Sequence, residues 1–374
     1  MVLKRQLERS PLRDIYEKVQ AGTRITDGEA LRLYETNDLH ILGAMANLVR
    51  ERKNGDNTYY NINRHIDYTN VCETTCKFCA FSRFENEEGA FSFTHQQIAQ
   101  KATEAFEKEH ITELHIVGGL HPKYELDWYE TMLRLLKKTV PTVHLKCFTA
   151  VEIAYFADKF NMTYEQILSR LKSAGLDSMP GGGAEIFHPE VREKICPGKA
   201  DAEQWMEVHK TAHRLGLKTN VTMLYGHIEN YSHRVDHMRR VRETQDETGG
   251  FQVFIPLAFH PDHTAMDHFA RPSGVEDLKT LAVGRIYLDN FAHIKAYWVT
   301  MGPRLAQLSL SYGVDDIDGT VIEENIYRMA GSDTPEGMSV TALKNLIRDA
   351  GRVPVERNSI YQAVKREAAV ATAR

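Results

Sequence analysis

The chain has 374 residues, with 46 Lys or Arg against 51 Asp or Glu and a formal net charge of -5. This slightly acidic balance argues against a nucleic-acid partner, because nucleic-acid-binding surfaces are basic. No uncharged apolar run reaches the ~18 residues of a membrane-spanning helix, and the charged N-terminus lacks the apolar core of a secretory signal. We therefore expect a cytoplasmic protein without a membrane partner.

Residues 1–56 are predicted to form helices that cap the rest of the chain. Within them, Thr26 is followed three positions later by Glu29, a pair that is typical of a helix start. Residues 57–320 alternate between short β-branched or aromatic runs and longer amphipathic segments, and residues 321–374 are predicted to be a helical extension. Alternating strands and helices favour an α/β fold with a parallel sheet.

The β-branched or aromatic runs predict the strands of the core. In chain order they are YYNINRHI, ITELHIVGG, VHLKCFTA, GLDSMPGGG, KTNVTMLYG, FQVFIPLAF and KAYWVT. Further helix starts are predicted at Thr94 with Gln97, Thr163 with Gln166, Asp201 with Gln204, and Ser273 with Glu276. Helix ends are predicted at Gly175, Gly216 and Gly249. The repeated unit and the length favour one TIM-like (β/α) barrel, full or partial, over two domains.

Three of the five cysteines lie within eight residues, directly after the first predicted strand. Cys72, Cys76 and Cys79 have the spacing C-x3-C-x2-C. Thiolates select zinc, copper or iron-sulfur clusters, and closed zinc sites and ordinary ferredoxin clusters take four ligands. Three thiolates on a cubane cluster leave one iron open to a small molecule that carries an amine and a carboxylate.

Other readings of the cysteines remain open at this point. A histidine could complete a zinc site, and an electron-transfer cluster or a non-catalytic, metal-bound barrel that serves as a scaffold would also use thiolates. Cys147 lies on a predicted strand and is expected to be a buried hydrophobic residue. Cys196 is expected to lie in a turn as a non-ligand.

The cysteine segment resembles the radical S-adenosylmethionine (radical SAM) superfamily. The resemblance implies a radical SAM barrel in which Cys72, Cys76 and Cys79 hold a 4Fe-4S cluster, and S-adenosyl-L-methionine binds the open iron. One electron passed into the sulfonium would then release methionine and a 5'-deoxyadenosyl radical. It also implies a flavodoxin- or ferredoxin-like electron donor, and places Phe78 near the adenine or the cluster.

Features at three more strand ends fit this resemblance, because the carboxyl ends of parallel strands meet at one edge. Gly118 and Gly119 follow the second strand, at the position where the superfamily contacts the amino group of S-adenosylmethionine. Glu185 follows the fourth strand and is expected near the ribose or the sulfonium. Tyr225 and Glu229 follow the fifth strand, in the segment that the superfamily uses for adenosine.

Longer runs resemble one family of the superfamily, the aminofutalosine synthases of menaquinone biosynthesis. These runs are GGGAEIFHPEVREKICPGKADAEQW, EVHKTAHRLGLKTNVTMLYGHIENYSHRVDHM, RETQDETGGFQVFIPLAFHP and IRDAGRVPVERNSIY. The family resemblance implies a transferase that forms a carbon-carbon bond. In it, the adenosyl radical adds to the enolpyruvyl group of 3-[(1-carboxyvinyl)oxy]benzoate, and aryl migration and decarboxylation give 6-amino-6-deoxyfutalosine. Dehypoxanthine futalosine cyclase and deazaflavin-cofactor synthase subunits share the cysteine spacing and stay alternatives.

The implied substrate carries two carboxylates, so cationic or hydrogen-bonding residues are expected to face it. Arg271 and His260 bracket the loop after the sixth strand and are the preferred candidates for catalytic residues. Further candidates near strand ends are Arg83, Arg304, His121 and His227.

Overall fold

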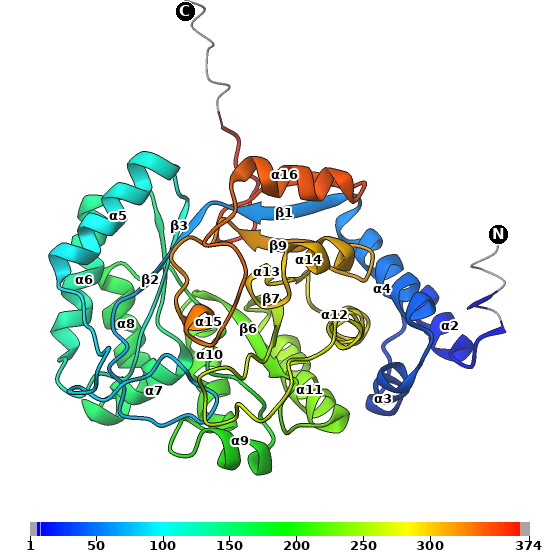
Figure 1. Ribbon diagram of the computed structural model, residues 1–374, viewed down its shortest axis with the longest axis horizontal. Helices are drawn as coiled ribbons and strands as arrows, with labels where there is room; N and C mark the ends of the chain where they lie inside the picture. The colour runs from blue at the N-terminus through cyan, green and yellow to red at the C-terminus, as the bar shows by residue number, and fades with distance from the viewer. Residues whose placement is uncertain (1–5, 8, 367–374) are drawn as a thin grey trace, which may run out of the picture.

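The protein is represented by a computed structural model that describes residues 6–7 and 9–366. At its centre is a seven-stranded sheet in which the strands follow one another in chain order, from β2 to β8 (Figure 1). The strands are β2 (Asn63–Asp67), β3 (Glu113–Val117), β4 (His144–Cys147), β5 (Ser178–Met179), β6 (Lys218–Tyr225), β7 (Phe251–Ala258) and β8 (His293–Ile294). Each pairs in parallel with the next. The predicted TIM-like barrel is confirmed in its partial form.

Helices surround this sheet. Those between the strands are α5 (His95–Glu109), α6 (Leu126–Thr139), α7 (Ala150–Lys159), α8 (Tyr164–Ala174), α9 (Pro189–Ile195), α10 (Ala202–Arg214), α11 (Tyr231–Thr248) and α12 (Gly274–Tyr287). The N-terminal helices are α2 (Arg13–Ala21), α3 (Asp27–Glu35) and α4 (Leu39–Asn54), and the later ones are α13 (Trp298–Met301), α14 (Pro303–Ser309), α15 (Ile326–Met329) and α16 (Val340–Asp349). The N-terminal helices lie beside α11 and α12 at one end of the molecule (Figure 1).

The predicted helix starts are present. Thr26, Thr94, Thr163 and Asp201 form reciprocal capping boxes with the predicted partners, and the Ser273 side chain accepts a hydrogen bond from the backbone of Glu276. Gly175 and Gly249 cap the ends of α8 and α11 with positive φ, a conformation that glycine adopts without a steric penalty. These starts and ends depend only on neighbouring residues.

A second, three-stranded sheet fills the gap between β2 and β8. Its strand order is β10-β1-β9, formed by β1 (Asn57–Asn61), β9 (Asp316–Gly319) and β10 (Val353–Glu356). Isolated bridges join Lys295, after β8, to Asp316, and Arg64 of β2 to Ile322. The segment 316–322 therefore lies between the first and the last strand of the large sheet.

Two strand predictions differ from the structure. The first predicted strand, YYNINRHI, is divided between β1 and β2, which belong to different sheets, because β1 pairs with β10 almost 300 residues later. Residues 321–366 accordingly include a strand as well as helices, and residues 367–374 of the predicted extension lie outside the described part of the chain. The run KAYWVT is not a strand along its length: β8 ends at Ile294, and α13 begins at Trp298.

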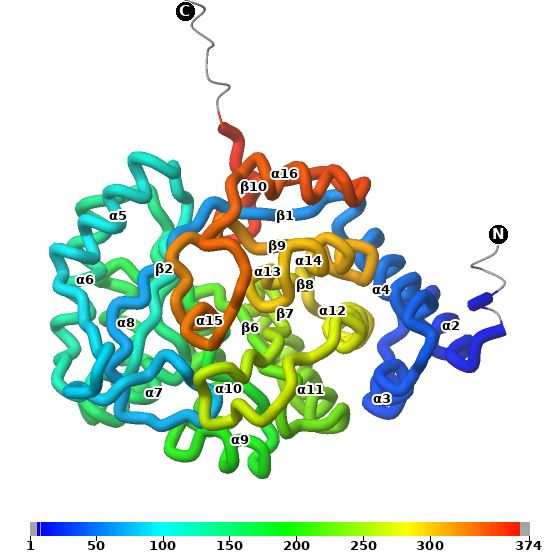
Figure 2. Tube along the Cα trace, in the orientation of Figure 1, coloured from blue at the N-terminus to red at the C-terminus, as the bar shows by residue number. Residues whose placement is uncertain are grey.

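The segment around α15 leads from β9 across the sheet. Figure 2 shows it in orange, in front of the strands and between β2 and β7. Ile326, Tyr327 and Ala330 of this segment line the cavity described below. The C-terminal part of the chain therefore helps to enclose the interior of the barrel.

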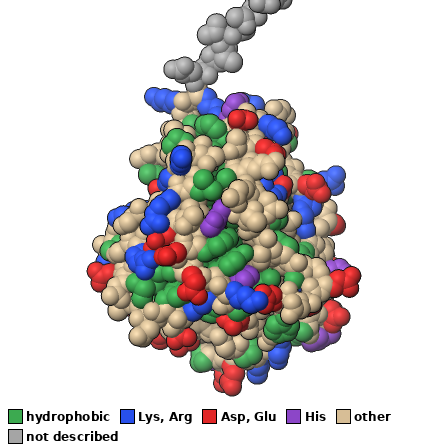
Figure 3. All heavy atoms as spheres, turned by 90° about the vertical axis from the view of Figure 1, so that its left-hand side faces the viewer, with side chains coloured by type: hydrophobic (Ala, Val, Ile, Leu, Met, Phe, Trp, Pro, Cys, Tyr) green, Lys and Arg blue, Asp and Glu red, His purple; other side chains and the backbone are tan. Residues whose placement is uncertain are grey.

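The surface on the side of α5, α6 and α8 carries mixed charges. Figure 3 shows Lys and Arg side chains interspersed with Asp and Glu on this face. Between α6 and α8, Arg170 Nε lies 2.5 Å from Glu130 Oε1, and Arg134 also pairs with Glu130 at 2.8 Å. Among the described residues, no helix is long and apolar enough to cross a membrane.

We predict that the buried ion pair at the start of β9 is essential for stability. Arg285 of α12 and Asp315 are both fully buried and paired. Arg285→Met would leave the Asp315 carboxylate with the His293 imidazole, 2.6 Å away, as its remaining side-chain partner, and breaking a buried pair costs about 3–5 kcal/mol. Equilibrium urea unfolding measures the loss. Lys108→Met is the control, because the exposed Lys108–Glu104 pair contributes about 0–1 kcal/mol, and an equal effect of the two variants would contradict the prediction.

Candidate active site

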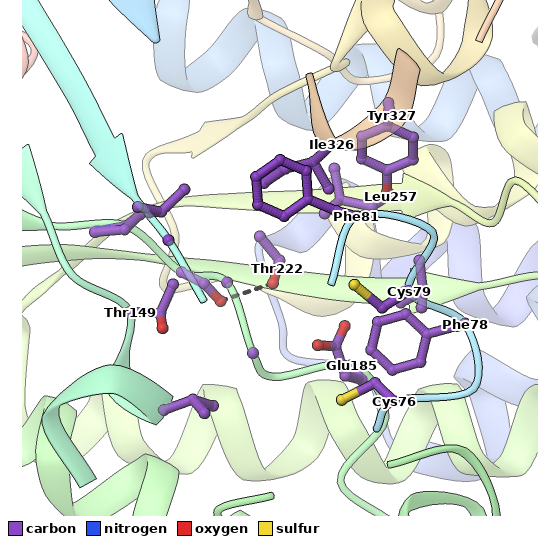
Figure 4. Close-up of a pocket in the computed structure, with 18 of the residues that line it drawn as sticks. Cys76, Phe78, Cys79, Phe81, Thr149, Glu185, Thr222, Leu257, Ile326 and Tyr327 are labelled. Carbon is purple, nitrogen blue, oxygen red and sulfur yellow. Dashed lines mark hydrogen bonds between the residues drawn. The ribbon is translucent and has the colours of Figure 1, made fainter. Parts of the chain in front are cut away.

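A cavity of about 310 Å³ opens among the carboxyl ends of the strands. This volume lies within the range of ~300–1,000 Å³ that is usual for small-molecule sites. Its lining comes from the strands β2, β3, β4, β6 and β7 and from the segments that follow β2, β3, β4, β5, β7 and β8. Figure 4 shows the end of the cavity where the cysteine loop meets Glu185 and the α15 segment.

All three clustered cysteines line this cavity. Backbone N–H groups of Leu120 and Ser82 point at the sulfurs of Cys72 and Cys79, each at 3.4 Å. The loop is also fixed through Lys77, whose N–H donates to Ile195 and whose carbonyl accepts from Ala265. N–H donors aimed at sulfur stabilise thiolates, which are the form that binds iron.

The three cysteine sulfurs do not lie close enough together in this structure to share one zinc ion. Ligand sulfurs of one tetrahedral zinc lie about 3.8 Å apart, because each Zn–S bond is about 2.3 Å. In the part of the chain that the structure describes, the group of potential ligands within 4.8 Å of one another is His188, Glu190 and His233, and the cysteines do not form one. Burial raises the pKa of the Cys76 thiol to about 12, so metal binding there displaces a proton.

The group of His188, Glu190 and His233 is a poor site for a metal cation. His188 precedes α9, and His233 lies in the first turn of α11, where its Nδ1 accepts a hydrogen bond from the Asn230 backbone. The positive ends of two helix dipoles disfavour a cation at this place. The chemistry therefore lies with the cysteines.

The glycines after the second strand of the large sheet are required by chain packing. A Cβ on Gly118 would lie 2.6 Å from the Tyr68 ring, and a Cβ on Gly119 would lie 2.2 Å from the Val71 carbonyl oxygen and 3.0 Å from the Cys72 Cβ. Both glycines line the cavity. Their small size therefore fixes the cysteine loop against the end of β3.

A charged pair stands beside the cysteine loop. Lys199 Nζ lies 2.5 Å from Glu185 Oε1 and 5.2 Å from the centre of the Phe78 ring. Burial opposes the charged form, but Glu185 raises the pKa of Lys199 above its ordinary value. Figure 4 shows Glu185, Phe78 and Cys76 close together. The structure thus brings two predicted cofactor residues to the cysteines and adds Lys199, which the sequence pattern did not predict.

Tyr225 and Glu229 are absent from the cavity lining. Tyr225 is fully buried, and its hydroxyl donates to Asp277 at 2.6 Å. Glu229 accepts from the backbone of Gly226 and His227 and pairs with Arg234 at 2.7 Å. Because its hydrogen bonds are made within the protein, the Glu229 carboxylate stabilises the turn after β6 and does not face the cavity.

The two preferred catalytic candidates differ in position. His260 lines the cavity; its Nε2 lies 2.8 Å from the Thr300 carbonyl oxygen, and its buried Nδ1 has no partner in the described structure. Burial lowers the pKa of His260, so its ring is neutral. Arg271 does not line the cavity and pairs with Asp262 at 2.6 Å. Nor do the remaining candidates Arg83, His121, His227 and Arg304 line it.

Comparison with known proteins agrees with this site. The Radical SAM superfamily model matches residues 66–241, and the CofH/MqnC C-terminal region matches residues 248–370. Aminodeoxyfutalosine synthase of Thermus thermophilus is 48% identical over 94% of this chain and 95% of its own length. The enzyme of the same name from Streptomyces coelicolor is 46% identical over 94% of each chain.

The chain belongs to the aminodeoxyfutalosine synthase family of radical SAM enzymes. The predicted superfamily, enzyme class and cofactors, a 4Fe-4S cluster and S-adenosylmethionine, are confirmed by this membership. A crystal structure of methylornithine synthase has the same fold, with a TM-score of 0.72, 16% identity, and coverage of 91% of this chain and 96% of the other. A small-molecule substrate is consistent with membership of the aminodeoxyfutalosine synthase family.

We predict that Gly119→Ala impairs cluster binding in this radical SAM enzyme. The added Cβ would meet Val71 and Cys72, and overpacking of this kind costs about 1–3 kcal/mol. Iron and sulfide per chain are expected to fall after anaerobic reconstitution. Gly28→Ala is the matched control, because a Cβ there meets nothing within 4 Å. Equal iron content in both variants would show that Gly119 does not fix the cysteine loop.

Proposed function

We propose that the enzyme forms 6-amino-6-deoxyfutalosine from S-adenosylmethionine and 3-[(1-carboxyvinyl)oxy]benzoate, in the futalosine route to menaquinone. The observation that carries the proposal is the 46–48% identity to aminodeoxyfutalosine synthases along nearly the whole chain, together with three cysteines in one cavity. When bound, the cluster and S-adenosylmethionine supply a 5'-deoxyadenosyl radical, which adds to the enolpyruvyl double bond before aryl migration and decarboxylation.

In this proposal the chain's own residues have four tasks. Cys72, Cys76 and Cys79 hold the cluster, and the proposed neighbours of S-adenosylmethionine are Phe78, Gly118, Gly119 and Glu185. Tyr225 and Glu229 lie outside the cavity lining and stabilise the turn after β6, the segment that the resemblance assigns to adenosine. His260 offers a neutral ring with a free Nδ1 to the substrate.

The cavity walls suit a radical reaction that must avoid water and stray hydrogen donors. Phe81, Ile255, Leu257 and Phe259 line it, and Tyr327 of the α15 segment stands over the same space (Figure 4). Apolar walls exclude water and hold the reacting carbons close together. An aromatic substrate would contact these side chains.

The proposal includes the source of the electron and the compartment. A flavodoxin- or ferredoxin-like protein would reduce the cluster, and the enzyme would work in the cytoplasm, where thiols stay reduced. The slightly acidic net charge of -5 supports a protein that works without a nucleic-acid or membrane partner.

One anaerobic assay tests the reaction. Reduced, reconstituted enzyme is incubated with S-adenosylmethionine and 3-[(1-carboxyvinyl)oxy]benzoate, and we expect an adduct that contains adenosine together with methionine. Cys79→Ala is expected to abolish both products, because a cluster with fewer thiolates is not held.

Other outcomes assign the chain elsewhere. Free 5'-deoxyadenosine without the adduct would favour a hydrogen-abstracting relative such as dehypoxanthine futalosine cyclase. One zinc per chain, instead of roughly four irons with absorption near ~400 nm, would favour the metal-bound scaffold.

A pair of variants tests the role of His260. His260→Phe keeps a ring but removes Nδ1 from the cavity, so KM for the benzoate substrate is expected to rise at least about tenfold, with KM for S-adenosylmethionine unchanged. Arg271→Ala is expected to have a smaller effect, because Arg271 binds Asp262 and the Gly331 carbonyl outside the lining. Steady-state kinetics measure both KM values. A larger rise in the KM for the benzoate substrate with Arg271→Ala than with His260→Phe would assign substrate binding to Arg271 instead of His260.

A further inference from the structure

Three nitrogen-bearing side chains form a row across the inner face of the barrel. His65 of β2 pairs in register with His115 of β3, and His115 pairs with Lys146 of β4. All three line the cavity. Each stands within its strand, whereas the cysteines and glycines follow the strand ends, so the row lies deeper than the cluster site. We call His65, His115 and Lys146 the cavity floor.

The two imidazoles of the cavity floor are stacked and neutral. Their ring centres lie 4.5 Å apart with an angle of 3° between the planes. Burial lowers the pKa of His65 to about 4, and burial with the neighbouring His65 and Lys146 lowers that of His115. A neutral imidazole keeps one N–H donor, so each ring can donate to a ligand without repelling Lys146.

Lys146 brings a charge to the cavity floor, and its acid partner stands behind it. Lys146 Nζ lies 2.5 Å from Glu113 Oε1, and Glu113 is fully buried and outside the cavity lining. Burial lowers the pKa of Lys146 and alone would raise that of Glu113, but Lys146, Arg357 and Lys295 hold the pKa of Glu113 well below its usual range, which favours the ionised pair. An ammonium group has three donors, and one of them serves Glu113.

The surroundings of the cavity floor complete a site for an aromatic acid. Lys295 and Asp318 also line the cavity, and they pair with each other at 3.1 Å, so this second ion pair adds no net charge. Ile255, Phe259 and Tyr297 line the same cavity and give it apolar walls. A flat ring fits between apolar walls, and a carboxylate fits N–H donors beside an ammonium group.

We propose that His65, His115 and Lys146 bind the ring carboxylate of the aryl substrate and hold the ring in place through the reaction. This inference rests on the proposed function. The ring carboxylate is the one that the reaction retains, whereas the enolpyruvyl carboxylate is lost. A contact with the retained group can therefore persist from substrate to product and keep the migrating ring in position.

Binding of probes to the cluster-loaded enzyme, without a reductant so that no radical forms, tests the inference. 3-Hydroxybenzoate carries the ring carboxylate but no enolpyruvyl group, phenol carries neither, and 2-phenoxyacrylate carries only the enolpyruvyl carboxylate. Isothermal titration calorimetry is expected to show that the wild-type enzyme binds 3-hydroxybenzoate at least about tenfold more tightly than phenol. Equal affinity for these two probes would overturn the proposal without any variant.

Variants then test whether the cavity floor causes the preference for 3-hydroxybenzoate over phenol. His115→Phe preserves the stacked ring but removes the donors, and Glu113→Gln/Lys146→Met removes both charges of the buried pair, so neither leaves an isolated charge. Each is expected to weaken binding of 3-hydroxybenzoate at least about tenfold and to leave 2-phenoxyacrylate unaffected. Unchanged affinity for 3-hydroxybenzoate, or an equal loss for 2-phenoxyacrylate, would overturn the assignment.

Two further variants serve as controls. Glu113→Gln alone removes the competing carboxylate from Lys146 and is expected to tighten binding of 3-hydroxybenzoate, and weakening equal to that of the double variant would count against the proposal. His209→Phe changes a buried histidine that packs on Trp205 outside the cavity lining. It is expected to leave the affinity unchanged, and a loss equal to that of His115→Phe would overturn the proposal.

The outcome is separable from that of the proposed function. Selective binding of 3-hydroxybenzoate without formation of the adenosine adduct would keep the cavity floor and reject the reaction. Adduct formation without selective binding would keep the reaction and reject the cavity floor.

Discussion

Parallel pairing of seven consecutive strands is the constraint on which the site depends. Because every strand runs in the same direction, each loop that leaves a carboxyl end begins at the same edge of the sheet. The cysteine loop, Gly118 and Gly119, and Glu185 meet there although they are separated by more than 100 residues. Register matters equally, since a slip of one residue turns a side chain to the other face. His65, His115 and Lys146 share the cavity because their strands pair at these residues.

Buried ion pairs stabilise the segment that lies between the first and the last strand of the large sheet. The strands β2 and β8 flank residues 316–322, and this segment carries acids that must find cations in the interior. Asp316 pairs with Arg357 at 2.6 Å, and Asp318 pairs with Lys295. These contacts join the C-terminal strand β10, the closing strand β9 and the cavity into one unit. The same segment continues into α15, whose residues line the cavity. The position of α15 therefore depends on these ion pairs.

Features with a local cause could be predicted from the sequence. Thr94 and Asp201 begin helices because their side chains accept from backbone N–H groups three residues away, and the cysteine spacing is set within one loop. The pairing of β1 with β10 could not be predicted, because it joins Tyr59 to Val355 and no local pattern indicates a partner so far along the chain. Glu229 illustrates the same limit: the sequence predicted its strand end, but burial against Arg234 turns it away from the cavity.

The polar interior of β2 to β4 departs from what stability alone would select. Parallel strands that are covered on both faces are usually apolar runs, and the interior of such barrels is usually filled by branched side chains. Here the runs NRHID, ELHIV and HLKC place His65, His115 and Lys146 inside. Buried polar groups cost free energy unless they are paired, and Glu113 stabilises only Lys146 among the three. When both faces of a strand are buried, its sequence does not alternate clearly between apolar and polar residues. The row of His65, His115 and Lys146 could therefore not be predicted from the sequence pattern. A bound ligand is the best explanation for the polarity of this part of the barrel.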